Sequence, residues 1–173
     1  MRFLLFLLLI PVLAQCQTVH IEKGRIAYKG SVKIDGITKT ELYERAKQAL
    51  LKNIKAAKEE TDIENKEKEE IVVGGRMRLS STHGVINTLK YTVKIAVKDD
   101  GYKYQVDSVY FKRTERGGKT IIIPSEELVN VMDMSGIPAI EMEKQLNEID
   151  MRIQQLLDLI NRDIRRTPIG NGQ

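Results

Sequence analysis

The chain has few of the residues that form redox, disulfide or metal sites. Its 173 residues include one cysteine, two histidines and no tryptophan. A single cysteine excludes an internal disulfide framework and a cysteine-based zinc site. The two histidines lie far apart in the sequence, with no HxxxH or ExxH pair to give metal-ligand spacing. We therefore expect no metal and no cofactor.

The chain also lacks a large excess of either charge. Lysine and arginine number 28 and aspartate and glutamate 24, which gives a net charge of +4. These charges are mixed along the chain rather than gathered in a basic block, so they do not indicate nucleic acid as a partner. With 42% hydrophobic and 30% charged residues, the composition excludes a disordered chain and a multi-span membrane protein.

Residues 1–16 have the pattern of an export signal. A positive Met1-Arg2 start precedes an apolar stretch that is too short to span a bilayer. Cleavage after Ala14 or after Cys16 fits the pattern. A third interpretation is a lipoprotein, because Leu13-Ala14-Gln15-Cys16 resembles a lipobox in which Cys16 is lipidated. All three interpretations predict export, to the periplasm, the outer membrane or the medium, and only the third tethers the protein to a membrane.

Alternation of apolar and polar residues predicts the strands of the mature chain. The alternating segments are residues 24–35, 71–81, 87–98, 102–113 and 120–123. Asp99-Asp100-Gly101 is a strong hairpin signal between the third and fourth segments. Gly74-Gly75 predicts a bulge in the second segment. Residues 17–24, before the first strand, are expected to be flexible.

An amphipathic helix is predicted after the first of these strands. Thr38 and Glu41 form a capping box, after which apolar residues recur at helical spacing from Leu42 to Ala57. The charged run that follows, residues 58–70, is interpreted as a solvated connector. A short helix is predicted from Ser125 to about Met132.

A long amphipathic helix is predicted over residues 136–166, before a disordered tail at 167–173. Its apolar seam repeats at intervals of four and three residues, as in a coiled coil. The helical stretch from Ala139 to Arg166 is about 42 Å long at about 1.5 Å per residue, longer than a small sheet is wide. We expect its last part to expose a candidate partner-binding patch, unless the helix stays on its own core. The patch comprises Leu156, Leu157, Ile160 and Ile164.

The order of elements predicts an α+β fold over residues 25–135. It has an antiparallel sheet of about five strands with helices on one face. Two segments, Gly36 to Ala49 and Lys90 to Tyr104, resemble the first helix and the central hairpin of the domain of unknown function 4468 family. That resemblance implies a fold like the TATA-binding protein and an exported bacterial protein. The family has no established activity, so the resemblance implies no catalytic residue.

Two features offer chemistry. His83 lies among hydroxyl residues in Ser80-Ser81-Thr82-His83-Gly84, which fits either a polar turn or, less simply, a hydrolase site. A group of tyrosines falls at the alternate strand positions that are predicted to face the core, which fits either ordinary core packing or a ligand cleft. These tyrosines are Tyr28, Tyr91, Tyr102, Tyr104 and Tyr110.

The sequence therefore favours an exported, non-enzymatic binding or assembly module of the cell envelope. Its partner would be another protein or a second copy of the chain, docked on the C-terminal helix. The alternatives are a periplasmic small-molecule carrier with a tyrosine-lined cleft and a hydrolase that uses His83. The carrier would need a cavity above about 300 Å³.

Overall fold

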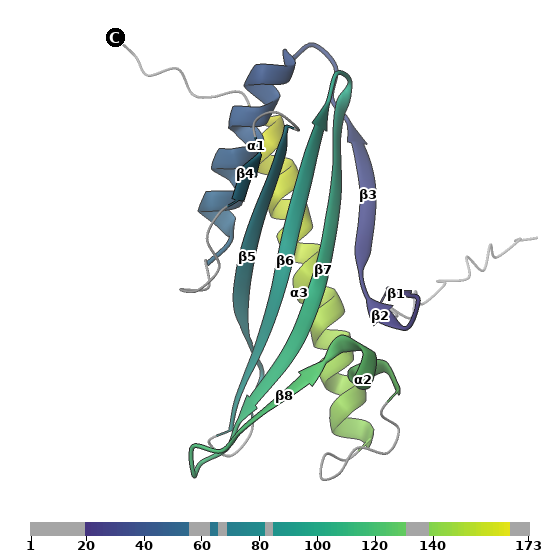
Figure 1. The fold of residues 1–173 in the computed structure, drawn as a ribbon, viewed down its shortest axis with the longest axis vertical. Helices are drawn as coiled ribbons and strands as arrows, with labels where there is room; N and C mark the ends of the chain where they lie inside the picture. The colour runs from purple at the N-terminus through teal and green to yellow at the C-terminus, as the bar shows by residue number, and fades with distance from the viewer. Residues whose placement is uncertain (1–19, 56–62, 66–68, 82–84, 131–138, 167–173) are drawn as a thin grey trace, which may run out of the picture.

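A long antiparallel sheet organises the part of the chain that the computed structural model describes, which is residues 20–55, 63–65, 69–81, 85–130 and 139–166 (Figure 1). The strand order is β3-β7-β6-β5-β4, and β8 pairs with the same edge of β7 as β3 does, farther along the strand. The strands are β3 (Tyr28–Lys33), β4 (Ile63–Asn65), β5 (Glu70–Leu79), β6 (Ile86–Lys98), β7 (Gly101–Thr114) and β8 (Thr120–Pro124). The predicted fold class is confirmed.

The central hairpin follows directly from the sequence. Residues of β6 alternate between buried and half-buried along nearly its whole length, as the alternating sequence predicts. Gly101 closes the turn to β7 with φ +150°, and a Cβ there would lie 2.0 Å from the Val32 carbonyl oxygen of β3. Glycine is therefore required at this turn because the neighbouring strand passes so close.

A bulge in β7 changes which side chains face the core. Lys90 pairs with Tyr110 and Thr92 pairs with Asp107, so Tyr91 lies opposite both Ser108 and Val109. Ser108 takes the left-handed backbone conformation that this extra residue requires, with φ +51°. Because side chains alternate with period two, the extra residue moves every later side chain to the opposite face.

The bulge was predicted in the wrong strand. The pairing of β5 with β6 runs without a shift through Gly74 and Gly75. Gly75 instead makes room for packing, since a Cβ there would lie 2.6 Å from the Tyr91 ring. The prediction that Tyr110 has core parity is also wrong, because the β7 bulge turns Tyr110 outward and leaves it 44% exposed.

Helix α1 (Lys39–Asn53) covers one face of the sheet and begins as predicted. The Thr38 hydroxyl accepts the Glu41 backbone N–H at 3.3 Å. The helix ends at Asn53, short of the predicted end at Ala57. Its buried side consists of Leu42, Tyr43, Ala46, Ala49 and Leu50.

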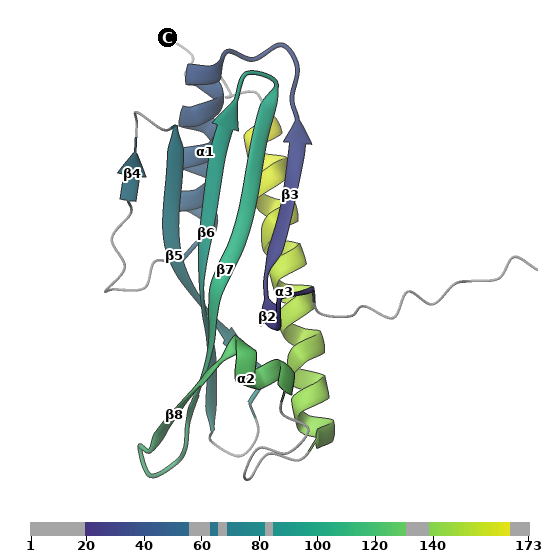
Figure 2. The same ribbon diagram turned by 45° about the vertical axis from the view of Figure 1, so that its right-hand side comes forward.

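Helix α3 (Ala139–Arg165) lies behind the same face, beside α1 (Figures 1 and 2). The prediction that the last part of this helix exposes an apolar patch is wrong. Leu156, Ile160 and Ile164 are buried in the core, and Leu157 is half-buried against it. The helix runs along the strands rather than across them. Strands of 13 and 14 residues are about 45 Å long, which matches the length of the helix.

Smaller elements lie near the start of β3. β1 (Ile21–Glu22) and β2 (Arg25–Ile26) form a hairpin where a flexible start was predicted, and α2 (Ser125–Asn130) follows β8. Residues 1–16 with Cys16, His83, the start of the predicted C-terminal helix at 136–138 and the tail at 167–173 lie outside the described residues. No helix of the described ranges combines the length and the apolar character needed to cross a bilayer.

Candidate functional site

The uncovered face of the sheet carries two adjacent cross-strand rows that we call the basic strip. The first row is Arg76, Lys90, Tyr110 and Pro124, and the second is Arg78, Thr88, Lys112 and Ile122. Each row crosses β5, β6, β7 and β8. The β7 bulge creates the strip, because without the bulge Tyr110 and Lys112 would face the core.

The basic strip combines positive charge with apolar surface. Four of its eight side chains are lysine or arginine, and none is aspartate or glutamate. Tyr110 and Ile122 expose 44% and 63% of their surface between these cations. Within the strip, exposed apolar groups alternate with charge of one sign, which is typical of surfaces that bind a partner of the opposite sign.

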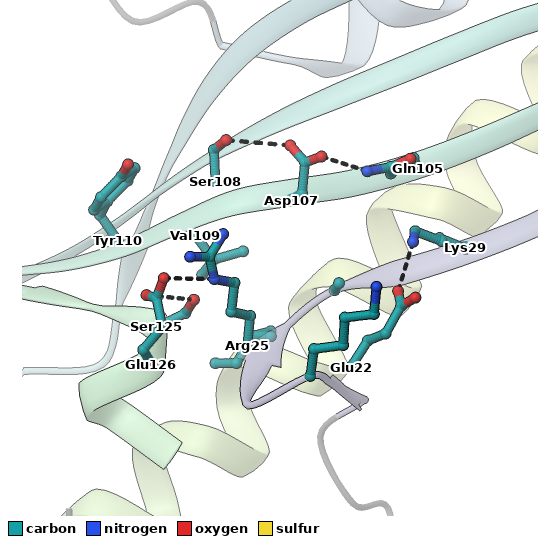
Figure 3. Close-up of a pocket in the computed structure, with 13 residues that line it drawn as sticks. Glu22, Arg25, Lys29, Gln105, Asp107, Ser108, Val109, Tyr110, Ser125 and Glu126 are labelled. Atoms are coloured by element: carbon teal, nitrogen blue, oxygen red, sulfur yellow. Dashed lines mark hydrogen bonds and ion pairs between the residues drawn. The ribbon is translucent and has the colours of Figure 1, made fainter. Parts of the chain in front are cut away.

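A separate hollow of about 470 Å³ lies between the β1–β2 hairpin, β7 and the start of α2 (Figure 3). Its charges neutralise one another. Arg25 Nε lies 2.7 Å from Glu126 Oε1, and Lys29 Nζ lies 2.7 Å from Glu22 Oε2. The hydrogen bond from Lys29 lowers the pKa of the Glu22 carboxyl. The hollow therefore has little unbalanced charge with which to recognise a ligand.

A buried carboxylate joins α3 to β3. The Tyr28 hydroxyl donates a hydrogen bond to Asp150 Oδ1 at 3.0 Å, and His20 Nδ1 lies 3.9 Å from the same oxygen. Burial, followed by the negative charge of Asp150, raises the pKa of the Tyr28 phenol. The phenol therefore remains a neutral hydrogen-bond donor, and the contact anchors α3 to the sheet. Neither His20 nor Asp150 was assigned a role from the sequence.

No described cavity is lined by the predicted tyrosines as a group: Tyr91 and Tyr110 each border a different hollow, and the one space that two of them share is small. Tyr102 and Tyr104 border a space of about 100 Å³ between the sheet and α3. The Tyr102 hydroxyl donates to Asn161 Oδ1 at 3.2 Å, which ties the ring to α3. Cavities that hold small molecules usually have at least about 300 Å³. Of the predicted group, Tyr28, Tyr91 and Tyr102 belong to the buried core.

The candidate hydrolase residue, His83, and the candidate lipidation residue, Cys16, lie outside the described residues. Within the described ranges, no group of three or more His, Cys, Asp or Glu side chains has the geometry to hold a metal ion.

Residues 28–112, which contain β3, α1 and the sheet through most of β7, match the family model described as a domain of unknown function (DUF4468) with TBP-like fold. The chain belongs to this DUF4468 family. The resemblance found in the sequence is therefore confirmed. No curated protein matches the chain.

Solved structures show the same fold as this DUF4468 chain. A TBP-like protein from Parabacteroides distasonis superposes with a TM-score of 0.69 at 16% identity, covering 86% of this chain and 98% of its own. A DUF4468 family protein from Bacteroides ovatus gives a TM-score of 0.64 at 13% identity, covering 87% and 92%. At these identities the likeness concerns the fold alone, so function depends on the side chains of this chain.

Proposed function

We propose that this chain is a non-enzymatic binding module of the cell envelope, exported by its N-terminal leader. It docks an acidic protein surface on the basic strip. The observation that carries this proposal is the strip itself, two rows of residues across four strands that hold four cations, no carboxylate, and exposed Tyr110 and Ile122.

The strip, rather than the C-terminal helix, is the binding surface. Leu156, Ile160 and Ile164 are buried against the chain's own core, so they are not accessible to a partner. The strip, in contrast, lies on the face opposite α1 and α3 (Figure 2). An acidic protein surface with apolar side chains at its centre would complement both the charge and the exposed Tyr110 and Ile122.

Binding fits the described polar groups better than catalysis does. A nucleophile needs a base within hydrogen-bond reach. Within the described part of the chain, His20 is the histidine, and its neighbours are the Asp150 carboxylate and the Tyr28 ring. The raised pKa of the Tyr28 phenol makes it a poor nucleophile.

Photo-crosslinking in the native host tests the proposed surface. A photoreactive phenylalanine analogue at Ile122 should form an adduct with one partner protein, whereas the same analogue at exposed Gln155 on α3 should not. The double variant Arg78→Glu/Lys112→Glu should abolish the Ile122 adduct, because it replaces two cations of the strip with carboxylates. Equal adducts from both positions, or an adduct that survives the charge reversal, would contradict the proposal.

Mass spectrometry of the native N-terminus tests export separately. We expect a chain that begins at Gln15 or Gln17, or at a lipid-modified Cys16. A native protein that retains Met1 would contradict export.

A further inference from the structure

A second hollow, which we call the edge cavity, opens beside the free edge of β5. Its volume is about 690 Å³, and it is lined by the end of α1, by β5 and β6, and by α3. β4 pairs only with residues 70–72 of β5, so the rest of that edge has no partner strand among the described residues. The Arg76 backbone N–H donates to the Lys55 carbonyl at 3.2 Å, which fixes the end of α1 against the edge.

The edge cavity is lined by cations from three elements. Lys55 comes from the segment after α1, Arg76 and Arg78 from β5, and Arg152 from α3. Among the described residues that line it there is no aspartate or glutamate. Like charges that share a hollow repel one another and attract an anion.

Most of these cations have no carboxylate partner in the part of the chain that the structure describes. No ion pair reaches Lys55, Arg76 or Arg78 from the described residues. Arg152 Nη2 contacts Glu148 Oε1 at 3.4 Å, but Glu148 also accepts the Ser80 backbone N–H through both of its oxygens, at 3.0 and 2.9 Å. The positive charge of the edge cavity is thus far less neutralised than that of the hollow in Figure 3.

Apolar side chains also line the edge cavity. Met77, Tyr91 and Leu156 contribute from the core side, and Ile86, which is 43% exposed, borders it on β6. The ring of Tyr91 is held in place because it packs against Gly75. The cavity therefore offers an apolar wall beside guanidinium groups, whose planar N–H forks suit carboxylate and phosphate oxygens.

We propose that the edge cavity binds a small organic anion in which a carboxylate or phosphate group is attached to an apolar body. Arg76 and Arg78 hold the anionic group, with Lys55 and Arg152 adding positive charge. The apolar body lies against Met77. Arg76 and Arg78 also belong to the basic strip, so the edge cavity extends around the edge of β5 from the uncovered face to the side of α3. This site goes beyond the proposed function, since it binds a small molecule and needs no protein partner.

Fluorescence anisotropy of naphthalene probes tests the site in the purified chain, whose lack of tryptophan keeps background emission low. 1-Naphthyl phosphate, 1-naphthoate or both should bind saturably with a dissociation constant below about 1 mM. Neutral 1-naphthamide should bind at least about tenfold more weakly. Whichever anion binds tighter identifies the preferred anionic group. Failure of both anions to saturate would overturn the proposal.

Paired variants separate a built site from general positive charge. Arg76→Gln/Arg78→Gln should weaken binding by about tenfold or more. Lys98→Gln/Arg116→Gln removes the same charge from exposed positions outside the cavity and should change binding by less than about twofold. Equal weakening by both pairs would overturn the proposal. Lys112→Glu, which disrupts the basic strip but does not line the cavity, should leave probe binding intact even if the protein partner is lost.

Discussion

Replacing Ile160 with alanine should strongly destabilise the chain, because α3 is part of its core. Ile160 is 2% exposed. The change removes three carbon atoms, worth about 2.4 kcal/mol at about 0.8 kcal/mol for each buried methylene. The cavity left behind adds to this loss, so we expect the free energy of unfolding to fall by about 3–4 kcal/mol. Urea unfolding followed by circular dichroism measures this change.

Ile140→Ala is the matched control, with the same chemistry in the same helix. Ile140 is 79% exposed, so its substitution removes only about a fifth of the transfer free energy, and the expected loss of stability is about 0.5 kcal/mol. A loss below about 1 kcal/mol for Ile160→Ala would place that side chain in solvent. The burial of α3 described above would then be refuted, and the docking patch predicted from the sequence would be restored.

Three other predictions concern the strands and their tyrosines. Gly101→Ala should cost about 2 kcal/mol or more in urea unfolding, because its Cβ would meet the Val32 carbonyl, whereas Gly117→Ala, which meets nothing within 4 Å, should cost less than about 0.5 kcal/mol. Tyr28→Phe should cost about 1–3 kcal/mol by leaving buried Asp150 without its donor; a loss equal to that of exposed Tyr110→Phe would contradict this. Burial raises the pKa of Tyr91 and Tyr102 from 10.0 to about 12. Stability should therefore be complete below pH 10 and fall toward pH 12, because the unfolded chain loses these protons first; a flat profile would contradict the burial.

Local signals in the sequence were sufficient for most of the fold. The start of α1 follows from Thr38 and Glu41, since a capping box depends on residues a single turn apart. The β6–β7 hairpin follows from alternation and from Gly101. Because each of these signals lies within one element or one turn, it can be recognised without knowledge of the rest of the chain.

Features that depend on long-range geometry could not be predicted in the same way. The β7 bulge is at Ser108, a residue with little preference for positive φ, whereas Gly74-Gly75 was the stronger local signal. The place of Ile160 in the core depends on the length of the sheet along its strands. The alternating segments implied this length, but the prediction of an exposed patch compared the length of the helix with the width of the sheet. The sequence did contain a signal for the buried contact of Asp150, because this carboxylate directly follows Ile149 within the apolar stripe of α3.

The basic strip could be predicted only in part. Alternation placed Arg76 and Arg78 on the polar face of β5 from the sequence alone. Their alignment with Lys112 and Ile122 needed the register of three neighbouring strand pairs. Tyr110 entered the strip only through the bulge, which reverses the parity assigned from the sequence.

The most direct test of the account compares aspartate at two adjacent positions of β7. Val109 is 1% exposed and Tyr110 is 44% exposed because of the bulge at Ser108. We predict that Val109→Asp unfolds the chain or lowers its stability by several kcal/mol, about 3 or more, while Tyr110→Asp changes stability by less than about 1 kcal/mol. The reverse result, with Val109→Asp tolerated and Tyr110→Asp unfolded, would mean that β7 has no bulge and that the basic strip does not exist.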